Sequence, residues 1–281
     1  MLIMNGKVLE AGAPETNLLN RGFKFGDGLF LEMRIFKGKV LFLEEHMGRM
    51  LAAMHLLKFS FDKNLWLKEI EEAIQKSIDI NQIDRNGRIQ LHLFRAGIGA
   101  FQPLSNEVAY LLEAYALKDD YFTSSIPVSL CDYQEMLLAS GTLSPFYCAN
   151  TLSLSLAAIY AKEEGFDHAL LYGAQGPSMS SFGNVFLIKQ KKLFTPSFDT
   201  ACVDGVMRAK VIELCKGLKI PVHEKKLRPK DFVQADEIFI SNELRGIVPV
   251  NNYQGREIEV KQYVISPFIR QCLLQFIEKI S

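Results

Sequence analysis

The hydrophobic period of the chain changes after its first 40 residues, and this change limits the folds available to the first half. Asn5-Gly6 and Lys37-Gly38 each separate two short apolar runs, which is the pattern of a β-hairpin. Two stretches at helical spacing and then two strand-like runs follow, at 46–59, 64–80, 87–97 and 107–117. Residues 1–117 are therefore expected to form a smaller α+β domain, an antiparallel sheet with two helices.

Strand and helix signals alternate beyond a polar segment, 118–127, which we interpret as a connector between two domains. Residues 128–281 then form a larger α/β domain. Its strands are expected at 127–133, 168–173, 184–196, 221–227, 237–241 and 246–258, and its helices at 150–165, 205–218 and 264–280. The stretch "GPSMSSFG", with Ser178, Ser180 and Ser181, is interpreted as a polar loop.

Composition argues against polymeric partners and metals. The 32 basic and 32 acidic residues cancel, so no net field attracts nucleic acid or an anionic membrane. The first ten residues do not resemble a leader, and no apolar run approaches the roughly 20 residues of a membrane span, which makes a cytoplasmic location the expectation. The five cysteines are scattered, and no histidines pair at metal-ligand spacing. We therefore expect reduced thiols and no metal site.

Three motifs resemble one enzyme family by their order and spacing. They are "NRGFKFGDGLFLEMR" at 20–34, "FLEEHMGRM" at 42–50 and "DGVMRAKVIEL" at 204–214. Together they resemble the class IV, or fold type IV, pyridoxal-phosphate family, which includes branched-chain and D-amino-acid aminotransferases and aminodeoxychorismate lyase. The resemblance covers nearly the whole chain. It implies a two-domain α+β fold like that of the D-amino-acid aminotransferases, a barrel-like sheet in the larger domain, pyridoxal 5′-phosphate as cofactor, and a homodimer.

Two stretches resemble the lyase branch more than the aminotransferase branch. "FRAGIGAFQP", at 94–103, resembles an Arg-Gly-x-Gly-Gly-x-x-x-Pro segment of the lyases, from which Ala96 and Ala100 depart. "ISNELRGIVPV", at 240–250, resembles their Asn-Ala-Leu segment. The sequence does not decide between the two ancestries.

The resemblance also assigns binding residues. Arg49 falls on the family's phosphate-binding arginine, and Val206 and Met207 fall on a turn whose backbone N–H groups face the phosphate. The resemblance also implies that Ser241 and Asn242 contact the cofactor. It implies that Arg34 and Arg95 bind a small anionic substrate. The alternative is that Arg49 is a solvated helix residue and that Gly205, before the turn, has only a backbone role.

Three substitutions fall within the expected cofactor site. Tyr147 occupies the position of the lysine that forms the Schiff base, and a phenol cannot form an imine. Met179 occupies the position of the carboxylate that keeps the pyridine nitrogen protonated, and a thioether cannot hold that proton. Glu243 occupies a position beside the phosphate, where a carboxylate is repulsive unless it turns away.

These substitutions predict a degenerate member of the family, without ordinary transaminase activity. The nearest lysines, Lys118 and Lys162, are too far along the chain to replace Tyr147 by a small shift of alignment. The alternative that both elements are misaligned, and that Lys189 or Lys191 is the catalytic lysine, stays open. Two other functions stay open as well. One is an enzyme that uses Tyr147 as acid or base, and the other is a non-catalytic partner of an active paralogue. Tyr147 can also simply fill the volume of a lost cofactor.

Overall fold

The computed structural model describes residues 1–10, 20–118 and 126–280. They form two compact units. The first contains Met1–Asp120 and the short segment Phe146–Asn150, and the second contains Tyr121–Pro145 and Thr151–Ile280. The whole of 128–281 was expected to lie in the second domain. The segment 146–150 departs from that division, because it packs with the first unit.

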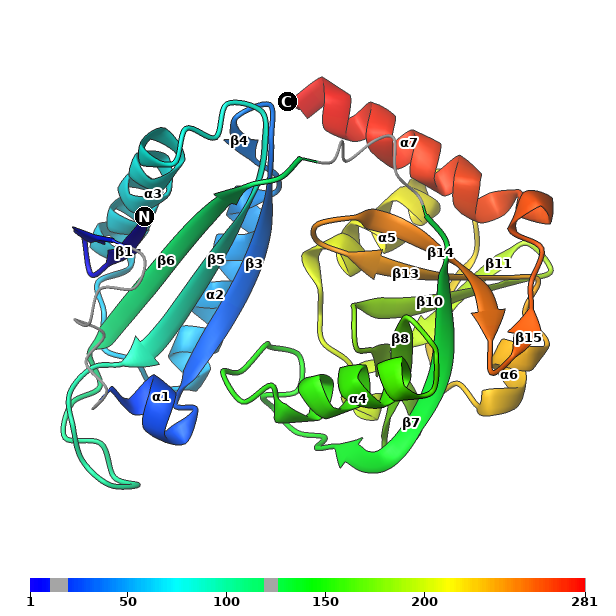
Figure 1. The fold of residues 1–281 in the computed structure, drawn as a ribbon, viewed down its shortest axis with the longest axis horizontal. Coiled ribbons are helices and arrows are strands. Elements are labelled where there is room, and N and C mark those ends of the chain that lie inside the picture. Colours follow the sequence, from blue (N-terminus) through cyan, green and yellow to red (C-terminus); the bar gives the residue numbers. More distant parts are fainter. Residues whose placement is uncertain (11–19, 119–125, 281) are drawn as a thin grey trace. The chain divides into compact units, whose positions relative to one another are not determined.

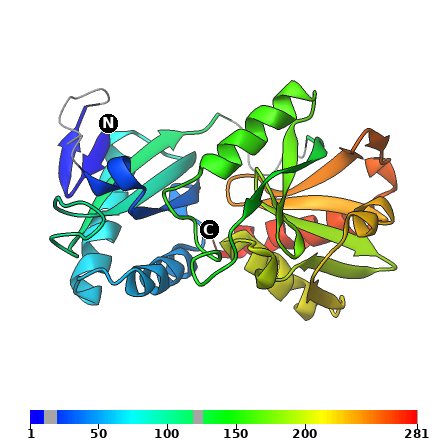
Figure 2. The same ribbon diagram turned by 90° about the horizontal axis from the view of Figure 1, so that it is seen from below.

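The first unit is a six-stranded antiparallel sheet with two long helices on one face (Figures 1 and 2). The strand order is β2-β1-β6-β5-β3-β4. Its elements are β1 (Leu2–Met4), β2 (Lys7–Leu9), α1 (Arg21–Phe25), β3 (Gly28–Phe36), β4 (Lys39–Val40), α2 (Leu43–Leu56), α3 (Lys63–Ile80), β5 (Asn86–Arg95) and β6 (Val108–Ala116). The predicted α+β character of this half is confirmed.

Both predicted hairpins are present, and their turns have the backbone conformation expected for the residue pairs that predicted them. Asn5 and Gly6 have φ angles of 45° and 77°, and Lys37 and Gly38 have 50° and 75°. Two consecutive residues with positive φ give a turn whose twist matches the flanking strands. The turns join Met4 to Lys7 in one hairpin and Phe36 to Lys39 in the other.

The core of the first unit lies between the sheet and α2 and α3. Alternate residues of the strands face the helices, so that Met33 and Leu91 pack in one cluster with Met54 and Ile70, all of them completely buried. Burying one such side chain stabilises the fold by about 1.5–3 kcal/mol. The opposite face of the same strands carries the polar and aromatic residues that concern the candidate site.

The second unit is built on a nine-stranded sheet, in which β12-β11-β10-β13-β14-β7-β8-β9 are neighbours and β15 pairs with β14. Its strands are β7 (Val128–Leu138), β8 (His168–Gly173), β9 (Gly176–Ser180), β10 (Asn184–Lys189), β11 (Lys192–Pro196), β12 (Val222–Lys225), β13 (Glu237–Asn242), β14 (Gly246–Tyr253) and β15 (Arg256–Glu257). Its helices are α4 (Leu152–Glu163), α5 (Val206–Gly217), α6 (Pro229–Val233) and α7 (Ile265–Ile280), with single 3₁₀ turns at Phe198–Thr200 and Val260–Gln262.

One prediction for the second unit was wrong. The stretch interpreted as a polar loop contains strand β9, which pairs with β8 and buries Ser178, Met179 and Ser180. The Ser180 hydroxyl donates to the Gly183 carbonyl oxygen and accepts from the Phe182 and Gly183 amides, so its polarity is satisfied inside the fold. Within the described residues, no helix combines the length and apolar character that a membrane span requires.

Candidate cofactor-binding site

The segment 146–150 lies beside β3 as an additional short strand of the first unit. The Phe30 amide donates to the Tyr147 carbonyl oxygen, and the Ala149 amide donates to the Gly28 carbonyl oxygen, both at 2.9 Å. Between them, Leu29 and Cys148 form a β-bridge. A slip of one residue would turn every side chain of this segment to the opposite face. These contacts therefore fix the register that places residue 147.

Tyr147 points away from the helices of the first unit. Its neighbours Phe146 and Cys148 pack against the helix-covered core, so alternation places Tyr147 on the other face of the sheet. Its ring lies 5.2 Å from that of Phe30, centroid to centroid, and the Phe30 ring stacks on His92 at 5.8 Å. Burial lowers the pKa of His92, against an opposing effect of Glu113, so this imidazole is neutral near pH 7.

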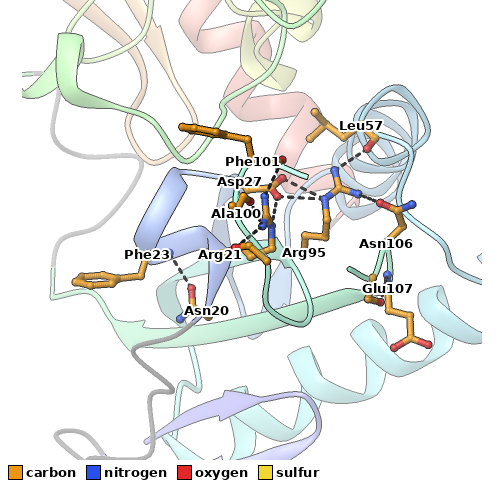
Figure 3. Close-up of polar contacts among 12 residues, drawn as sticks. Asn20, Arg21, Phe23, Asp27, Leu57, Arg95, Ala100, Phe101, Asn106 and Glu107 are labelled. Atoms are coloured by element: carbon orange, nitrogen blue, oxygen red, sulfur yellow. Dashed lines mark hydrogen bonds and ion pairs between the residues drawn. The ribbon is translucent and has the colours of Figure 1, made fainter. Parts of the chain in front are cut away.

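Arg95, a predicted substrate ligand, is almost completely buried in a network of protein groups (Figure 3). Its Nε donates to Asp27 (Oδ2 at 3.1 Å), Nη1 donates to Asn106 Oδ1 (2.6 Å), and Nη2 donates to the Leu57 carbonyl oxygen (2.8 Å). All three nitrogens of the guanidinium group are thus engaged within the first unit. The geometry supports a structural role, and the substrate role of Arg95 stays a prediction.

Arg21 shares the Asp27 carboxylate with Arg95 and was not singled out from the sequence. Its Nε donates to Asp27 Oδ2 at 2.7 Å, and its Nη1 donates to the carbonyl oxygens of Gly99 and Ala100 at 3.2 and 2.6 Å. In Figure 3 the two guanidinium groups approach the same carboxylate. The available sequence signal was the nearby pair Arg21 and Asp27 in the glycine-rich stretch.

Two glycines of that stretch allow close packing against the neighbouring strand. A Cβ at Gly28 would overlap the Leu93 carbonyl oxygen of the neighbouring strand, and one at Gly22 would lie 2.8 Å from Phe94 Cβ. Gly26 ends α1 with a φ of 62°, in the left-handed region. The stretch therefore brings α1 close against β5.

Two other predicted ligands lie on elements of the first unit. Arg34 is on β3 and is almost completely buried, and Arg49 is on α2 and is half-buried. His46, one turn before Arg49, is buried, and its pKa is lowered to about 3, first by burial and then by the charge of Arg49. The phosphate role of Arg49 and the substrate role of Arg34 stay predictions.

The N-terminus of α5, in the second unit, is the element predicted to hold the phosphate. Gly205 is the N-cap residue, and Val206 and Met207 are the first two helical residues, both buried. The Met207 amide donates to the Glu243 carboxylate, with Oε2 at 3.1 Å and Oε1 at 3.2 Å. Glu243 therefore does not turn away from the helix. It binds the N–H group that the family resemblance assigned to a phosphate.

The space at this helix end is also limited. A Cβ on Gly205 would lie 2.5 Å from Asn184 Oδ1 and 3.1 Å from Glu243 Oε1. The Asn184 amide is held in place because it donates to the Val203 carbonyl oxygen at 2.7 Å. A side chain at position 205 would have to displace the Asn184 and Glu243 side chains, which favours glycine there without reference to a ligand.

The side chains of Ser241 and Asn242 differ in their hydrogen bonds. The Asn242 side chain donates to the Phe182 carbonyl oxygen (2.7 Å) and accepts from the Leu244 and Arg245 amides (2.8 and 3.0 Å), so it builds the turn that carries Glu243. The Ser241 hydroxyl is buried and has no hydrogen-bond partner within the described residues. Ser241 pairs with Asn184 across β13 and β10, so both side chains lie on one face of the sheet.

Met179, on β9, is 2% exposed and lies opposite Leu171 on β8. Its thioether has no charge with which to hold a proton on a pyridine ring. The residues described at these positions therefore do not fit a bound pyridoxal phosphate. The helix end faces an internal carboxylate, and neither position 147 nor position 179, where the resemblance predicts the lysine and the carboxylate, carries such a group.

No group of three or more His, Cys, Asp or Glu side chains in the described part of the chain is arranged to hold a metal ion. The five cysteines are free thiols.

Comparisons with known proteins identify the family. The sequence profile described as "Amino-transferase class IV" matches residues 28–253. The D-alanine aminotransferase of Bacillus licheniformis is 23% identical over 259 residues, 92% of this chain and 89% of the relative. The aminodeoxychorismate lyase of Vibrio harveyi is 25% identical over 263 residues, 89% of this chain and 92% of the relative.

Solved structures show the same fold. The branched-chain amino acid aminotransferase of Escherichia coli superposes with a TM-score of 0.83 at 22% identity, covering 97% of this chain and 92% of that one. This match extends over both units. Because the family profile spans most of the sequence, the chain belongs to the class IV aminotransferase family, with the fold type IV architecture.

Proposed function

We propose that the protein is a class IV scaffold that has lost covalent pyridoxal chemistry. Ordinary transamination and the lyase reaction both require a lysine amine, and the family resemblance predicts Tyr147 at that position. The observation that carries the proposal is the strand pairing of segment 146–150. Because backbone hydrogen bonds on both sides of Cys148 fix its register on β3, no small shift brings a lysine to residue 147.

The lysines considered as substitutes lie on other elements. Lys162 is in the last turn of α4, whereas residue 147 precedes that helix and lies in the extended segment paired with β3. Lys189 ends β10, and Lys191 is the second residue of the two-residue turn between β10 and β11. Lys189 Nζ donates to Gln234 Oε1 at 2.9 Å on the surface. Met179, on strand β9, supports the same conclusion, because a thioether stands at the position predicted for the carboxylate.

We further propose that the protein is a cytoplasmic homodimer with a pocket for a small anionic molecule. The dimer follows from the family resemblance, and the anionic ligand from the predicted roles of Arg34 and Arg95. Light scattering of the purified protein tests the dimer, and a mass of about 64 kDa, twice that of the 31.8 kDa chain, is expected.

Borohydride trapping tests the loss of imine chemistry. Purified protein is incubated with pyridoxal 5′-phosphate, reduced, digested and searched by mass spectrometry for a phosphopyridoxyl group on lysine. We expect no stoichiometric label on any single lysine. A full label on one lysine of folded wild-type protein contradicts the proposal. The enzymatically active relatives provide the positive control for the trapping procedure.

A second function is favoured by the aromatic row beside Tyr147. Tyr147, Phe30 and His92 lie in contact on one face of the first unit's sheet, and Glu32 is two residues from Phe30 on the same face. Burial raises the pKa of Glu32, with Gln90 and Arg88 opposing, so its carboxyl holds a proton more readily than a solvated one. These are groups suited to acid-base chemistry.

Deuterium exchange tests this second function. A panel of small keto and amino acids is incubated with the protein in D₂O and followed by NMR. If Tyr147 moves a proton, exchange at carbon is expected in the wild-type protein and is expected to be lost in Tyr147→Phe. Exchange that is equal in the two proteins excludes Tyr147 as the acid or base.

A further inference from the structure

Strand β13 of the second unit carries a carboxylate at each end, and each carboxylate binds the N-terminus of a helix. At its first residue, Glu237 accepts hydrogen bonds from the amides of Val264, Ile265 and Ser266, at 2.8, 2.7 and 2.7 Å, where α7 begins. Just beyond its last residue, Glu243 accepts from Met207 in the first turn of α5. The strand therefore supplies an anion to two helices.

This arrangement follows from the electrostatics of helix ends. The first N–H groups of a helix have no partner within the helix, and the helix dipole places partial positive charge there. A carboxylate and a phosphate satisfy this end in the same way. A carboxylate from the same chain is always present, so an external anion must displace it.

Displacement of Glu243 is opposed by the way in which its turn is held. Residues 243–245 connect β13 to β14, and Asn242 fixes this turn through its bonds to Leu244 and Arg245. The Asn242 amide is anchored in turn to the Phe182 carbonyl oxygen. The backbone of Glu243 is therefore held by a strand pair and by an anchored side chain.

The space around the helix end leads to the same conclusion. Asn184 Oδ1 and Glu243 Oε1 lie on the Gly205 side of the helix end, within 2.5 and 3.1 Å of the place that a Cβ on Gly205 would take. A phosphate placed against Met207 N would meet two oxygens that are acceptors or negatively charged. Both contacts are unfavourable for a dianion.

We propose that Glu243 is a built-in anion that closes the α5 N-terminus to phosphate, so that the ligand of this unit is a molecule without a phosphate group. This inference deepens the proposed function, since it states which ligand class the scaffold has given up. It concerns anion binding alone and does not depend on residue 147.

Pyridoxamine 5′-phosphate and pyridoxamine are the probes that isolate this effect. Neither has an aldehyde, so neither can form an imine with a lysine, and they differ only by the phosphate. Their dissociation constants are measured by calorimetry for the wild-type protein, Glu243→Thr and Glu243→Gln at constant ionic strength. We expect equal binding of both probes to the wild-type protein. We expect Glu243→Thr to prefer the phosphorylated probe by about tenfold or more.

The Glu243→Gln variant separates the effect of the negative charge from the effect of a side-chain oxygen that occupies the helix end. It removes the negative charge but retains an oxygen that can accept from Met207 N, so its preference is expected to lie between those of the wild type and Glu243→Thr. Glu213→Thr is the matched control. It removes a carboxylate from the exposed part of the same helix, where Glu213 pairs with Lys210 at 3.2 Å, and no gain of preference is expected.

Two results overturn the proposal. One is a wild-type protein that already binds the phosphorylated probe at least tenfold more tightly. The other is a pair of folded Glu243 variants that acquire no preference. Failure of the proposed function is recognised separately, because it appears as a borohydride-trapped lysine and not as a change in these binding ratios.

Discussion

Replacement of Asp27 by asparagine tests whether Arg95 is part of the framework of the first unit. Asp27 is the shared partner of Arg21 and Arg95, whose side chains are only 4% and 8% exposed. One ion pair at about 3 Å has a Coulomb energy of about 5.5 kcal/mol at an effective dielectric constant of 20, before desolvation is subtracted. Because asparagine keeps one acceptor oxygen, we take the lower end of the measured range for a broken buried pair, about 3 kcal/mol.

The chain offers a direct assay for this loss. Trp66 is its single tryptophan and is buried in α3, so its fluorescence reports the unfolding of the first unit. With a urea dependence of about 2 kcal/mol per M, a loss of about 3 kcal/mol lowers the midpoint by about 1.5 M. Asp79→Asn is the control, because Asp79 is exposed on the same helix as Trp66. Equal midpoints for the two variants would refute a structural role for the Arg21–Asp27–Arg95 network.

Two further changes have expected signs in the same assay. Gly28→Ala is expected to lower the urea midpoint because its Cβ overlaps the Leu93 carbonyl oxygen, whereas Gly48→Ala, in open space on α2, is expected to stabilise the helix by about 0.5–1 kcal/mol. A raised midpoint for Gly28→Ala would contradict the packing argument. His46 takes up a proton near pH 6.5 when unfolded but only near pH 3 when folded. The free energy of unfolding is therefore expected to fall as the pH drops below about 6.5, by up to about 1.4 kcal/mol per pH unit. Urea titrations between pH 7 and 5 check this, and a His46→Gln variant with the same slope as wild type would contradict it.

Local chemistry explains what could be predicted from the sequence. Asn5-Gly6 and Lys37-Gly38 lie between apolar runs and adopt the positive φ angles that such pairs favour, so both hairpins were predictable from neighbouring residues. The same holds for α2, α3 and α5, whose apolar spacing is set within each helix. The family resemblance could also be found from the sequence, because it depends on short motifs in a fixed order.

The features that were wrong or could not be predicted come from contacts between residues far apart in the chain. Strand β9 was interpreted as a loop because it is rich in serine and glycine, and its burial depends on β8 and on the turn at Gly183. The position of Tyr147 beside Phe30 depends on a pairing across more than 100 residues, which no local pattern indicates. The orientation of the Glu243 side chain toward α5 depends on the hydrogen bond between Asn242 and Phe182, which are 60 residues apart.

In the proposed function, the three substitutions affect three separate requirements of the cofactor, and this predicts how their reversals combine. Tyr147→Lys supplies an amine and Met179→Glu a carboxylate, but Glu243 still closes the helix end that would anchor the phosphate. The double variant is therefore expected to form an imine with pyridoxal 5′-phosphate only at high concentration. Adding Glu243→Thr is expected to lower the half-saturating concentration by about tenfold, measured by the absorbance of the imine. Pyridoxal, which has no phosphate, must show no such gain, because a gain with both aldehydes would mean that Glu243 acts on the amine or the ring and not on the phosphate.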